Sequence, residues 1–316
     1  MKSKVLLHIF AVLLLCGLGL AVYSNTFHVP FQFDDQVFIT ENYILRAFHK
    51  IPDLWRSVDT MKRWVGFLTL AWNYALSGDH VIGYHLVNLG IHLLDGLLAY
   101  WFVFLILSHP QIALWQKGWW FQNKGAIPFL AAGLFLVHPV QTESVTYISQ
   151  RFTVLVVFFY LLAVCLYWKA RIQSRRPGKI RFAVYIFGVL MCAILGFFTK
   201  ENMITLPLML LALEIYFNPK GSRKWLFFGA GGAVIVITAA CVAYPLTFKQ
   251  IFEAHIDEGI TWGNYLLTQF RVLMTYFRLM VLPVHQNIDY DYRLSHSLFE
   301  VPTAFSFLAL VAFFAA

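Results

Sequence analysis

Long apolar runs separated by short polar segments recur along the whole chain. About nine of them are candidates for membrane-spanning helices, at residues 5–22, 80–107, 126–138, 152–168, 182–199, 203–217, 225–246, 264–282 and 299–316. A run of about 20 apolar residues crosses the hydrocarbon core of a bilayer. Backbone groups in lipid must be hydrogen-bonded within their own segment, so these runs predict helices. The expected fold is an all-α, polytopic membrane helix bundle that occupies residues 1–316 as one domain.

A shorter apolar run, residues 64–77, differs from the others because it carries Trp64 and Trp72. Tryptophan is enriched at membrane interfaces, so we expect this segment to form an interfacial helix. It would lie in a long first outer loop, residues 23–79. The N-terminal run is expected to be a retained first helix, because its apolar part is longer than a signal-peptide core. The run that reaches Ala316 has no flanking charge, so we expect the natural chain to continue beyond it.

The distribution of charge predicts the orientation of the chain in the membrane. The chain is 13% charged, about half of what soluble domains carry, which excludes an ordinary soluble protein. With the N-terminus in the cytoplasm, the inside segments 1–4, 108–125, 169–181 and 218–224 hold thirteen basic residues and no acidic one. The outside segments 23–63, 139–151, 200–202 and 247–262 hold eight basic and ten acidic residues. This pattern follows the positive-inside rule. The net charge of +8 is therefore interpreted as a topology signal and not as nucleic-acid binding.

Two adjacent acidic residues, Asp34 and Asp35, follow the first predicted helix in the segment Phe33-Asp34-Asp35-Gln36. Neighbouring carboxylates repel each other, so one of them can hold a proton more tightly. They are candidates for a general base at the bilayer surface, or for ligands of a divalent cation. The alternative is a turn or a helix cap, which aspartate also favours.

The second predicted span carries four polar residues at steps of three, four and three: His85, Asn88, His92 and Asp95. This spacing places them on one helix face. Polar groups in a membrane are costly and normally face the protein interior. The stripe is either part of a site or a set of hydrogen bonds that ties helices together.

More candidates lie in the predicted outer connections. His138 begins the connection after the third span, and Glu143, Tyr147 and Arg151 recur every four residues, as if aligned on a short helix. Lys200 and Glu201 occupy a tight connection between two apolar runs. They are either part of a site or a snorkelling lysine with a paired glutamate.

The eighth predicted span carries two arginines and two threonines on one face: Thr268, Arg271, Thr275 and Arg278. Arginine in an apolar helix needs an anionic partner, for which phosphate or an acidic side chain of the bundle is suitable. The four cysteines all lie inside apolar runs, which indicates buried thiols and not disulfides or metal ligands.

Several segments resemble a known family when taken together in order. They are FDDQ (33–36), RW-GFLTLAWNYALSG (63–78), GYHLVNLGIHLLDGLL (83–98), HPVQTESVTYISQR (138–151), TKENMITLPL (199–208) and the run from Arg271 to LPVHQNIDYDY (282–292). The set resembles the membrane half of the transmembrane and tetratricopeptide-repeat O-mannosyltransferase-like proteins, which are glycosyltransferases of the GT-C superfamily. One departure is Arg63-Trp64-Val65, where the family usually has Arg-Pro-Leu. The tetratricopeptide repeats of the family are also absent from this sequence.

The resemblance implies an inverting glycosyltransferase that moves mannose or a similar hexose from a polyprenyl-phosphate donor. The acceptor would be a protein Ser or Thr hydroxyl, and the site would face the periplasm or lumen, in the inner membrane if the source is bacterial. Asp34 or Asp35 would be catalytic. The candidates for donor phosphate or sugar binding are His138, Glu143, Arg151, Lys200, Glu201 and Arg271.

Two other functions fit the same residues. One is a ligase or polymerase of lipid-linked glycan, which shares the donor chemistry but uses a glycan acceptor. The other is a transporter or scaffold, in which acidic residues would line a pore through the middle of the bilayer. Clustering of the acidic residues at the outer side, beside a long first loop, favours an enzyme. No cofactor is certain, and a divalent cation at Asp34 and Asp35 is an open alternative.

Overall fold

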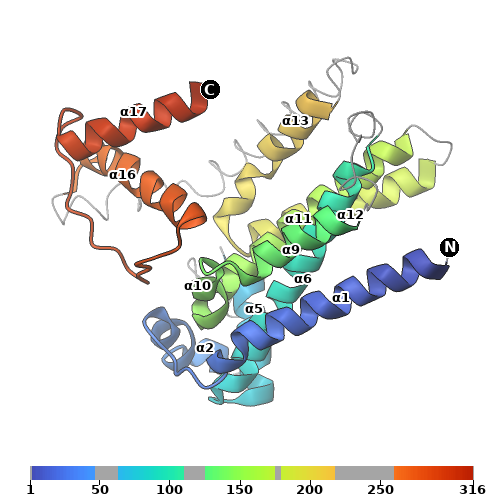
Figure 1. Cartoon of the computed structure of the whole chain (residues 1–316). Coiled ribbons are helices and arrows are strands. Elements are labelled where there is room, and N and C mark those ends of the chain that lie inside the picture. Colours follow the sequence, from blue (N-terminus) through green and yellow to red (C-terminus); the bar gives the residue numbers. More distant parts are fainter. Residues whose placement is uncertain (1, 47–62, 110–124, 175–178, 218–259, 316) are drawn as a thin grey trace. The chain divides into compact units, whose positions relative to one another are not determined.

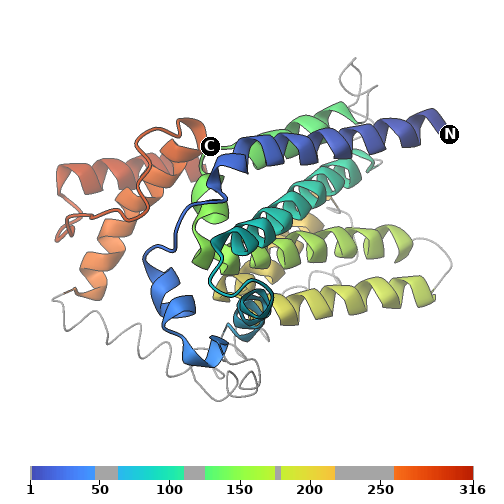
Figure 2. The same cartoon turned by 90° about the horizontal axis from the view of Figure 1, so that it is seen from below.

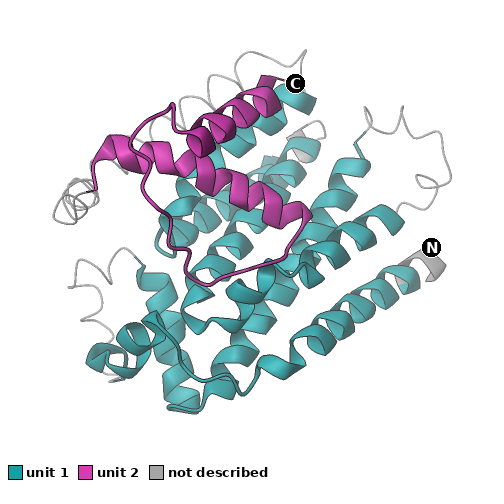
Figure 3. Ribbon diagram, turned by 60° about the vertical axis from the view of Figure 1, so that its left-hand side comes forward, with its two compact units in different colours: residues 1–234 teal, residues 235–316 magenta. Residues whose placement is uncertain are grey.

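The computed structural model of the chain describes residues 2–46, 63–109, 125–174, 179–217 and 260–315. Every regular element within these ranges is helical, which agrees with the all-α prediction. The chain divides into two compact units, residues 1–234 and 235–316 (Figure 3). The single domain expected over residues 1–316 stays a prediction.

Within the described residues, unit 1 consists of helices of 4 to 27 residues. Its helices are α1 (Lys2–Tyr23), α2 (Tyr43–Arg46), α5 (Trp64–Ser77), α6 (Val81–Leu107), α9 (Ala126–Val137), α10 (Gln141–Thr146), α11 (Arg151–Ser174), α12 (Lys179–Phe197) and α13 (Leu206–Phe217). Short turns of 3₁₀ or π helix lie at Ser24–Thr26, Gln36–Thr40, Ile148–Gln150 and Glu201–Thr205. Helices α6, α11 and α12 lie side by side in both views (Figures 1 and 2).

Four helical segments of the described ranges are long and apolar enough to cross a membrane: Leu6–Thr26, Val81–Leu107, Ile148–Ile172 and Lys179–Phe197. They match four of the predicted spans. Helices α9 and α13 have 12 residues each, so each is about 18 Å long, which is less than the hydrocarbon thickness of about 30 Å. The predicted span at 225–246 lies outside the described residues. The total of nine spans and the GT-C architecture therefore stay predictions.

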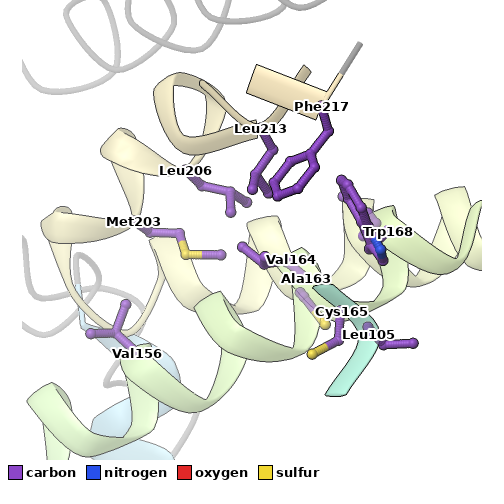
Figure 4. Packing of buried hydrophobic residues seen from close by; sticks show 12 residues of the cluster. Leu105, Val156, Ala163, Val164, Cys165, Trp168, Met203, Leu206, Leu213 and Phe217 are labelled. Carbon is purple, nitrogen blue, oxygen red and sulfur yellow. The ribbon is translucent and has the colours of Figure 1, made fainter. Parts of the chain in front are cut away.

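A large apolar cluster joins α6, α11, α12 and α13. Figure 4 shows Trp168 of α11 close to Phe217 of α13, and their ring centroids are 4.8 Å apart. Next to this cluster, the Arg171 guanidinium forms an ion pair with Glu214, and it joins α11 to α13. The outward faces are apolar as well: Leu13 of α1 is 65% exposed and Ile180 of α12 is 81% exposed. Apolar side chains outside as well as inside are expected of helices that contact lipid.

The predicted interfacial segment, residues 64–77, forms a helix with the same bounds, α5. One face of α5 is packed against the bundle, because Phe67 and Leu70 are buried in a cluster that includes Phe152 of α11. A Cβ atom on Gly66 would lie 2.1 Å from the Phe152 ring, so glycine permits this close approach. Trp72, on the outer face, is 65% exposed. Helix formation is confirmed, and placement at the membrane interface stays a prediction.

Unit 2 contains α16 (Trp262–Val281) and α17 (Val301–Ala315), joined by an extended segment. The Thr268 hydroxyl accepts a hydrogen bond from the Ser295 backbone N–H at 2.9 Å, and the Thr303 hydroxyl donates to the Ser295 hydroxyl at 2.8 Å. Phe270 of α16 also packs against Phe307 of α17. The polar face predicted for α16 is therefore used partly within unit 2.

Candidate active site at one end of unit 1

Most of the predicted site residues come together at one end of unit 1. This end is formed by the turn after α1, the start of α5, the α9–α10–α11 connections and the end of α12. Figure 1 shows α2, α5 and α10 at this end, away from the N-terminus. The segments involved are the described parts of 23–63, 139–151 and 200–202, which the alternation of spans predicted to share one side.

The two adjacent aspartates occupy different environments. Asp35 is only 1% exposed. Its Oδ2 atom accepts a hydrogen bond from the Gln32 N–H at 3.0 Å. Its Oδ1 atom accepts from the Ser149 N–H at 2.7 Å and also from the Ser149 hydroxyl. Asp34 is exposed, and its backbone N–H donates to the Tyr147 hydroxyl oxygen at 2.9 Å. The structure thus anchors Asp35 and leaves the carboxylate of Asp34 accessible.

The backbone before the aspartates is held in an unusual conformation. Phe33 has a φ of 47°, in the left-handed region that non-glycine residues seldom adopt. Its ring packs edge-on against Tyr147, with centroids 6.3 Å apart. Strained backbone of this kind persists where surrounding contacts hold it, and it often accompanies functional sites.

Burial and hydrogen bonding act in opposite directions on Asp35. Burial raises the pKa of its carboxyl group, while the hydrogen bonds from Ser149 and Gln32 and the nearby His85 lower it, and the net shift is upward. Burial likewise raises the pKa of Tyr147 to about 12, a shift that the hydrogen bond from the Asp34 N–H partly offsets. Tyr147 therefore stays a neutral phenol at physiological pH.

Glu143 and Lys200 are connected through two intermediate side chains. The Lys200 ammonium donates to the Thr153 hydroxyl at 2.7 Å, and the Thr153 hydroxyl donates to the Gln150 carbonyl oxygen at 2.5 Å. The Gln150 amide donates to Glu143 Oε1 at 3.2 Å. Partial burial raises the pKa of Glu143, and the Lys200 charge reduces this shift.

The predicted alignment of Glu143, Tyr147 and Arg151 on one short helix is wrong. Helix α10 ends at Thr146, Tyr147 is extended with ψ of 112°, and a 3₁₀ turn precedes α11. The chain direction changes at this break, so Glu143 and Tyr147 face the exposed end while Arg151 points into the bundle.

Two partly exposed or half-buried cations at this end, Lys200 and Arg63, lie near Glu201. The predicted pairing of Glu201 with its neighbour Lys200 is replaced by an ion pair with Arg63, at 2.9 Å. Burial and the nearby Arg63 charge lower the pKa of Lys200, although Glu201 and Glu143 oppose this. Partial burial raises the pKa of Glu201, but its own backbone N–H and Arg63 outweigh burial, so the net shift is downward.

Arg151 is fully buried at the start of α11 and contacts two other helices, α5 and α6. Its Nε atom donates to Asn88 Oδ1 at 2.7 Å. Its Nη2 atom donates to Asn73 Oδ1 at 2.7 Å and to the Tyr84 carbonyl at 3.0 Å, and Nη1 donates to the Thr69 carbonyl at 3.3 Å. The donor-phosphate role predicted for Arg151 stays a prediction, but these contacts direct its guanidinium away from the exposed surface.

The polar stripe of α6 is buried along its whole length, as its shared face predicts. His85 contacts the Val29 carbonyl at 2.9 Å, Asn88 donates to the Ile148 carbonyl at 3.2 Å, and His92 contacts the Leu136 carbonyl at 3.1 Å. Asp95 is 1% exposed, and its Oδ1 atom has no hydrogen-bond partner among the described residues. These bonds attach α6 to the connections that form the candidate site.

Two predicted site residues lie apart from this arrangement. His138 follows α9, and its Nδ1 atom accepts a hydrogen bond from the Val140 N–H at 3.3 Å, within its own turn. Arg271 belongs to unit 2, where it donates to the Arg293 carbonyl at 2.8 Å and its guanidinium lies 5.9 Å from the centre of the Tyr292 ring. Within the ranges described, no three His, Cys, Asp or Glu residues gather as a metal site would require.

Sequence reasoning missed three residues that complete the site: Arg63, Asn73 and Ser149. Asn73 could have been noticed as an amide in the middle of an apolar helix. Arg63 appeared only as the first residue of a variant motif, and nothing in the pattern connected it with Glu201, 138 positions later. Ser149 carries no recognisable signal, because serine is common in helix connections.

Comparisons with known proteins agree with the resemblance. The chain is 32% identical to Protein O-mannosyl-transferase F38B6.6 of Caenorhabditis elegans over 306 residues, which is 89% of this chain and 39% of that protein. It is 28% identical to human Protein O-mannosyl-transferase TMTC4 over 65% of this chain and 29% of the relative. It is 30% identical to human Protein O-mannosyl-transferase TMTC2 over 62% of this chain and 23% of the relative. No protein-family model and no solved structure matches.

The matched region thus spans less than two fifths of the length of each of these relatives. Matches to several members of one group, from nematode and human, cover between 62% and 89% of this chain. The chain belongs to the transmembrane and tetratricopeptide-repeat O-mannosyltransferase-like family.

Proposed function

We propose that this chain forms the membrane-embedded catalytic part of a protein O-mannosyltransferase. The donor is a polyprenyl-phosphate-linked mannose or similar hexose, and the acceptor is a Ser or Thr hydroxyl of a protein. The reaction takes place at the outer face of the membrane. The observation that supports this most directly is the gathering of an accessible carboxylate, Asp34, and two cations, Lys200 and Arg63, at one end of unit 1 in a relative of O-mannosyl-transferases.

Asp34 is assigned as the general base and Asp35 as the residue that positions it. A base must reach the proton of the acceptor hydroxyl, and Asp34 is exposed while both oxygens of Asp35 are used within the protein. Tyr147 supports this assignment, because its hydroxyl accepts the Asp34 N–H and fixes the backbone that carries the carboxylate.

The reaction needs one proton transfer and one substitution. The acceptor oxygen attacks the anomeric carbon and its proton passes to the Asp34 carboxylate. The bond from the anomeric carbon to the phosphate oxygen breaks, and the polyprenyl phosphate leaves with the electron pair. A single displacement with one carboxylate inverts the anomeric configuration, by the same geometric logic as in inverting glycosidases.

Lys200 and Arg63 are assigned to the donor phosphate. The leaving phosphate requires stabilisation of negative charge, which an ammonium and a guanidinium supply. Within the described residues, the Lys200 ammonium donates one hydrogen bond, to Thr153. An ammonium has three donors. The pair Arg63–Glu201 is partly exposed, so the phosphate can compete with Glu201 for the guanidinium.

The first test replaces Asp34 by asparagine. Removing a general base should reduce sugar transfer to a protein acceptor by roughly 100- to 10,000-fold. The control is Asp79→Asn, an exposed carboxylate paired with Arg46 outside the proposed chemistry, which should transfer at the wild-type rate. The measurement is transfer of labelled hexose from polyprenyl phosphate by purified protein in lipid.

Full activity of the Asp34→Asn variant would remove Asp34 from the mechanism. Transfer to a glycan in place of a protein acceptor would indicate the ligase or polymerase alternative. A chelator added to the same assay tests the divalent cation at Asp34 and Asp35: loss of activity that a divalent ion restores would support it.

The second test concerns the phosphate. Lys200→Gln and Arg63→Gln should each raise the KM for the donor by roughly 10- to 100-fold, because a charge-assisted hydrogen bond contributes about 1.5–3 kcal/mol. Lys179→Gln is the matched control, since Lys179 begins α12 at the opposite end of that helix. An unchanged donor KM in both site variants would place the phosphate elsewhere, with Arg151 and Arg271 as the remaining predicted cations.

A further inference from the structure

Arg151 is a buried charge without a hydrogen-bonded carboxylate. None of its surface is exposed, and all four of its hydrogen bonds in the described structure end on neutral oxygens, of Asn73, Asn88, Thr69 and Tyr84. Its guanidinium also lies 5.6 Å from the centre of the Tyr84 ring. Burying a guanidinium is costly unless its donors are satisfied. A bundle that bears this cost is expected to gain a defined arrangement from it.

The hydrogen bonds of Arg151 lead to the candidate catalytic turn through Asn88. The Asn88 side chain accepts from Arg151 Nε on its oxygen and donates from its nitrogen to the Ile148 carbonyl at 3.2 Å. The next residue, Ser149, donates both its N–H and its hydroxyl to Asp35. The sequence of contacts is therefore Arg151, Asn88, the 148–149 turn, and Asp35.

The hydrogen bonds of Arg151 also hold α5 and α6 against the start of α11. Helix α11 follows directly after the 148–149 turn, whose Ser149 donates to Asp35. These contacts fix the turn that presents Asp34.

We propose that Arg151, acting through Asn88 and Ser149, is the positioning residue of the aspartate turn, and not a ligand of the donor phosphate. The catalytic consequence rests on the proposed function, whereas the structural part does not. A phosphate that bound Arg151 would have to displace at least one of its four buried hydrogen bonds. Lys200 and Arg63 present their charges to phosphate at a smaller cost.

The decisive variants are Arg151→Lys and Asn88→Ala. Lysine keeps the charge but has no planar fork that could reach acceptors on two other helices. Asn88→Ala keeps the arginine but removes the acceptor of its Nε atom and the donor to the Ile148 carbonyl, which together link Arg151 to the 148–149 turn. The control is Arg171→Lys, a partly buried arginine of the same helix that pairs with Glu214.

The readout that does not depend on activity is hydrogen–deuterium exchange of residues 30–36 in detergent. The amides of Gln32, Asp34 and Asp35 are hydrogen-bonded in this turn, and they should exchange at least about tenfold faster in both decisive variants than in the control. Unchanged exchange in Asn88→Ala and Arg151→Lys would overturn the proposal. If Arg151→Lys does not fold, Asn88→Ala alone decides.

Donor kinetics provide the second readout. A positioning role lowers kcat in both variants and leaves the KM for the donor within about twofold of the wild type. A raised donor KM in Arg151→Lys, with normal kinetics in Asn88→Ala, would instead identify a phosphate ligand and overturn the proposal. If the wild-type protein transfers no sugar, the proposed function fails, and the exchange measurement still decides the role of Arg151.

Discussion

Two chemically identical side chains, Asp34 and Asp35, have different surroundings, and the proposed function gives them different tasks. The Gln32 and Ser149 donors take up both oxygens of Asp35, and a carboxylate with satisfied oxygens anchors a turn well. Asp34 has its backbone held by Tyr147 and its carboxylate exposed. A carboxylate can act as a base only when a substrate proton can approach it, so the division of tasks follows from hydrogen bonding and exposure.

The buried carboxyl of Asp35 should make the stability of the protein depend on pH. Its pKa lies above the ordinary value of 3.8 because of burial, so the folded state binds the proton more tightly than the unfolded state does. The stabilisation that Asp35 provides is therefore fully present below pH 3.8, and it is lost as the pH rises through the pKa of Asp35 in the folded state. At low pH the Asp35→Asn variant should be less stable than the wild type by about 1–3 kcal/mol. Its NH₂ group would face the Gln32 N–H, so two donors would meet where the wild type has a donor and an acceptor.

The measurement is the Tm of the wild type and of Asp35→Asn in detergent across pH 3–8. The difference in Tm should narrow as pH rises, because only the wild type bears the cost of ionising this group. Asp79→Asn, at an exposed site, serves as the reference. A difference that widens with pH would mean that the hydrogen bonds from Ser149 and Gln32, and not burial, dominate the pKa of Asp35.

At the residue scale, the sequence predicted the candidate site residues better than it predicted the residues that contact them. The family resemblance implied a donor phosphate at Arg151, but the folded chain supplies amide and carbonyl oxygens from α5 and α6. Those partners are 63 to 82 positions away, and they meet Arg151 only because the helices pack. For the same reason the Arg63–Glu201 pair could not be predicted.

At the scale of elements, the apolar runs predicted helix positions well because burial in lipid leaves few alternatives to helix. The segments 80–107 and 64–77 became α6 and α5 with nearly the predicted bounds. The spacing of Glu143, Tyr147 and Arg151 gave a wrong prediction, because a spacing of four residues also occurs by chance across the break between α10 and α11. The break at Tyr147 depends on its contact with the first loop, which periodicity does not encode.

The packing of α5 against α11 leads to a prediction about the stability of the protein. Gly66→Ala should destabilise the protein by about 1–3 kcal/mol, since the added methyl group would overlap the Phe152 ring. That ring cannot move aside easily, because Phe67 and Phe38 pack against it with centroids 5.1 and 5.8 Å away.

Gly90→Ala is the matched control, as another glycine within a helix. A Cβ atom there would meet nothing within 4 Å, so alanine should be neutral or stabilising by about 0.5–1 kcal/mol. Thermal unfolding of both variants in detergent checks the pair. Equal Tm values for Gly66→Ala and the wild type would show that α5 is not held against α11 at this point.

At the scale of the whole molecule, one end of unit 1 collects the candidate chemistry, and the basic residues Lys169 and Arg171 lie near the far end of α11, just as Lys179 and Arg181 lie at the far end of α12. Thirteen basic residues and no acidic one occupy the predicted inside segments, against eight basic and ten acidic residues outside. The number of spans cannot be predicted from apolar runs alone. Runs such as 126–138 and 203–217 form helices of 12 residues, whose length does not decide between a span and a packed segment.

The last prediction concerns the side of the membrane on which the candidate site of unit 1 lies. That side determines whether the site can use donor lipid of the outer or of the inner leaflet. Two single-cysteine variants test this, Glu41→Cys and Ile180→Cys. Glu41 lies in the first loop beside the candidate site, and Ile180 lies at the start of α12, where its side chain is 81% exposed. Each is introduced after Cys16, Cys165, Cys192 and Cys241 are replaced by alanine. The basic inside segments should keep Ile180 on the cytoplasmic side. A membrane-impermeant thiol reagent should therefore label Glu41→Cys in intact cells and Ile180→Cys only after permeabilisation. The reverse labelling would place Asp34 and Lys200 in the cytoplasm, where they would require a donor in the inner leaflet.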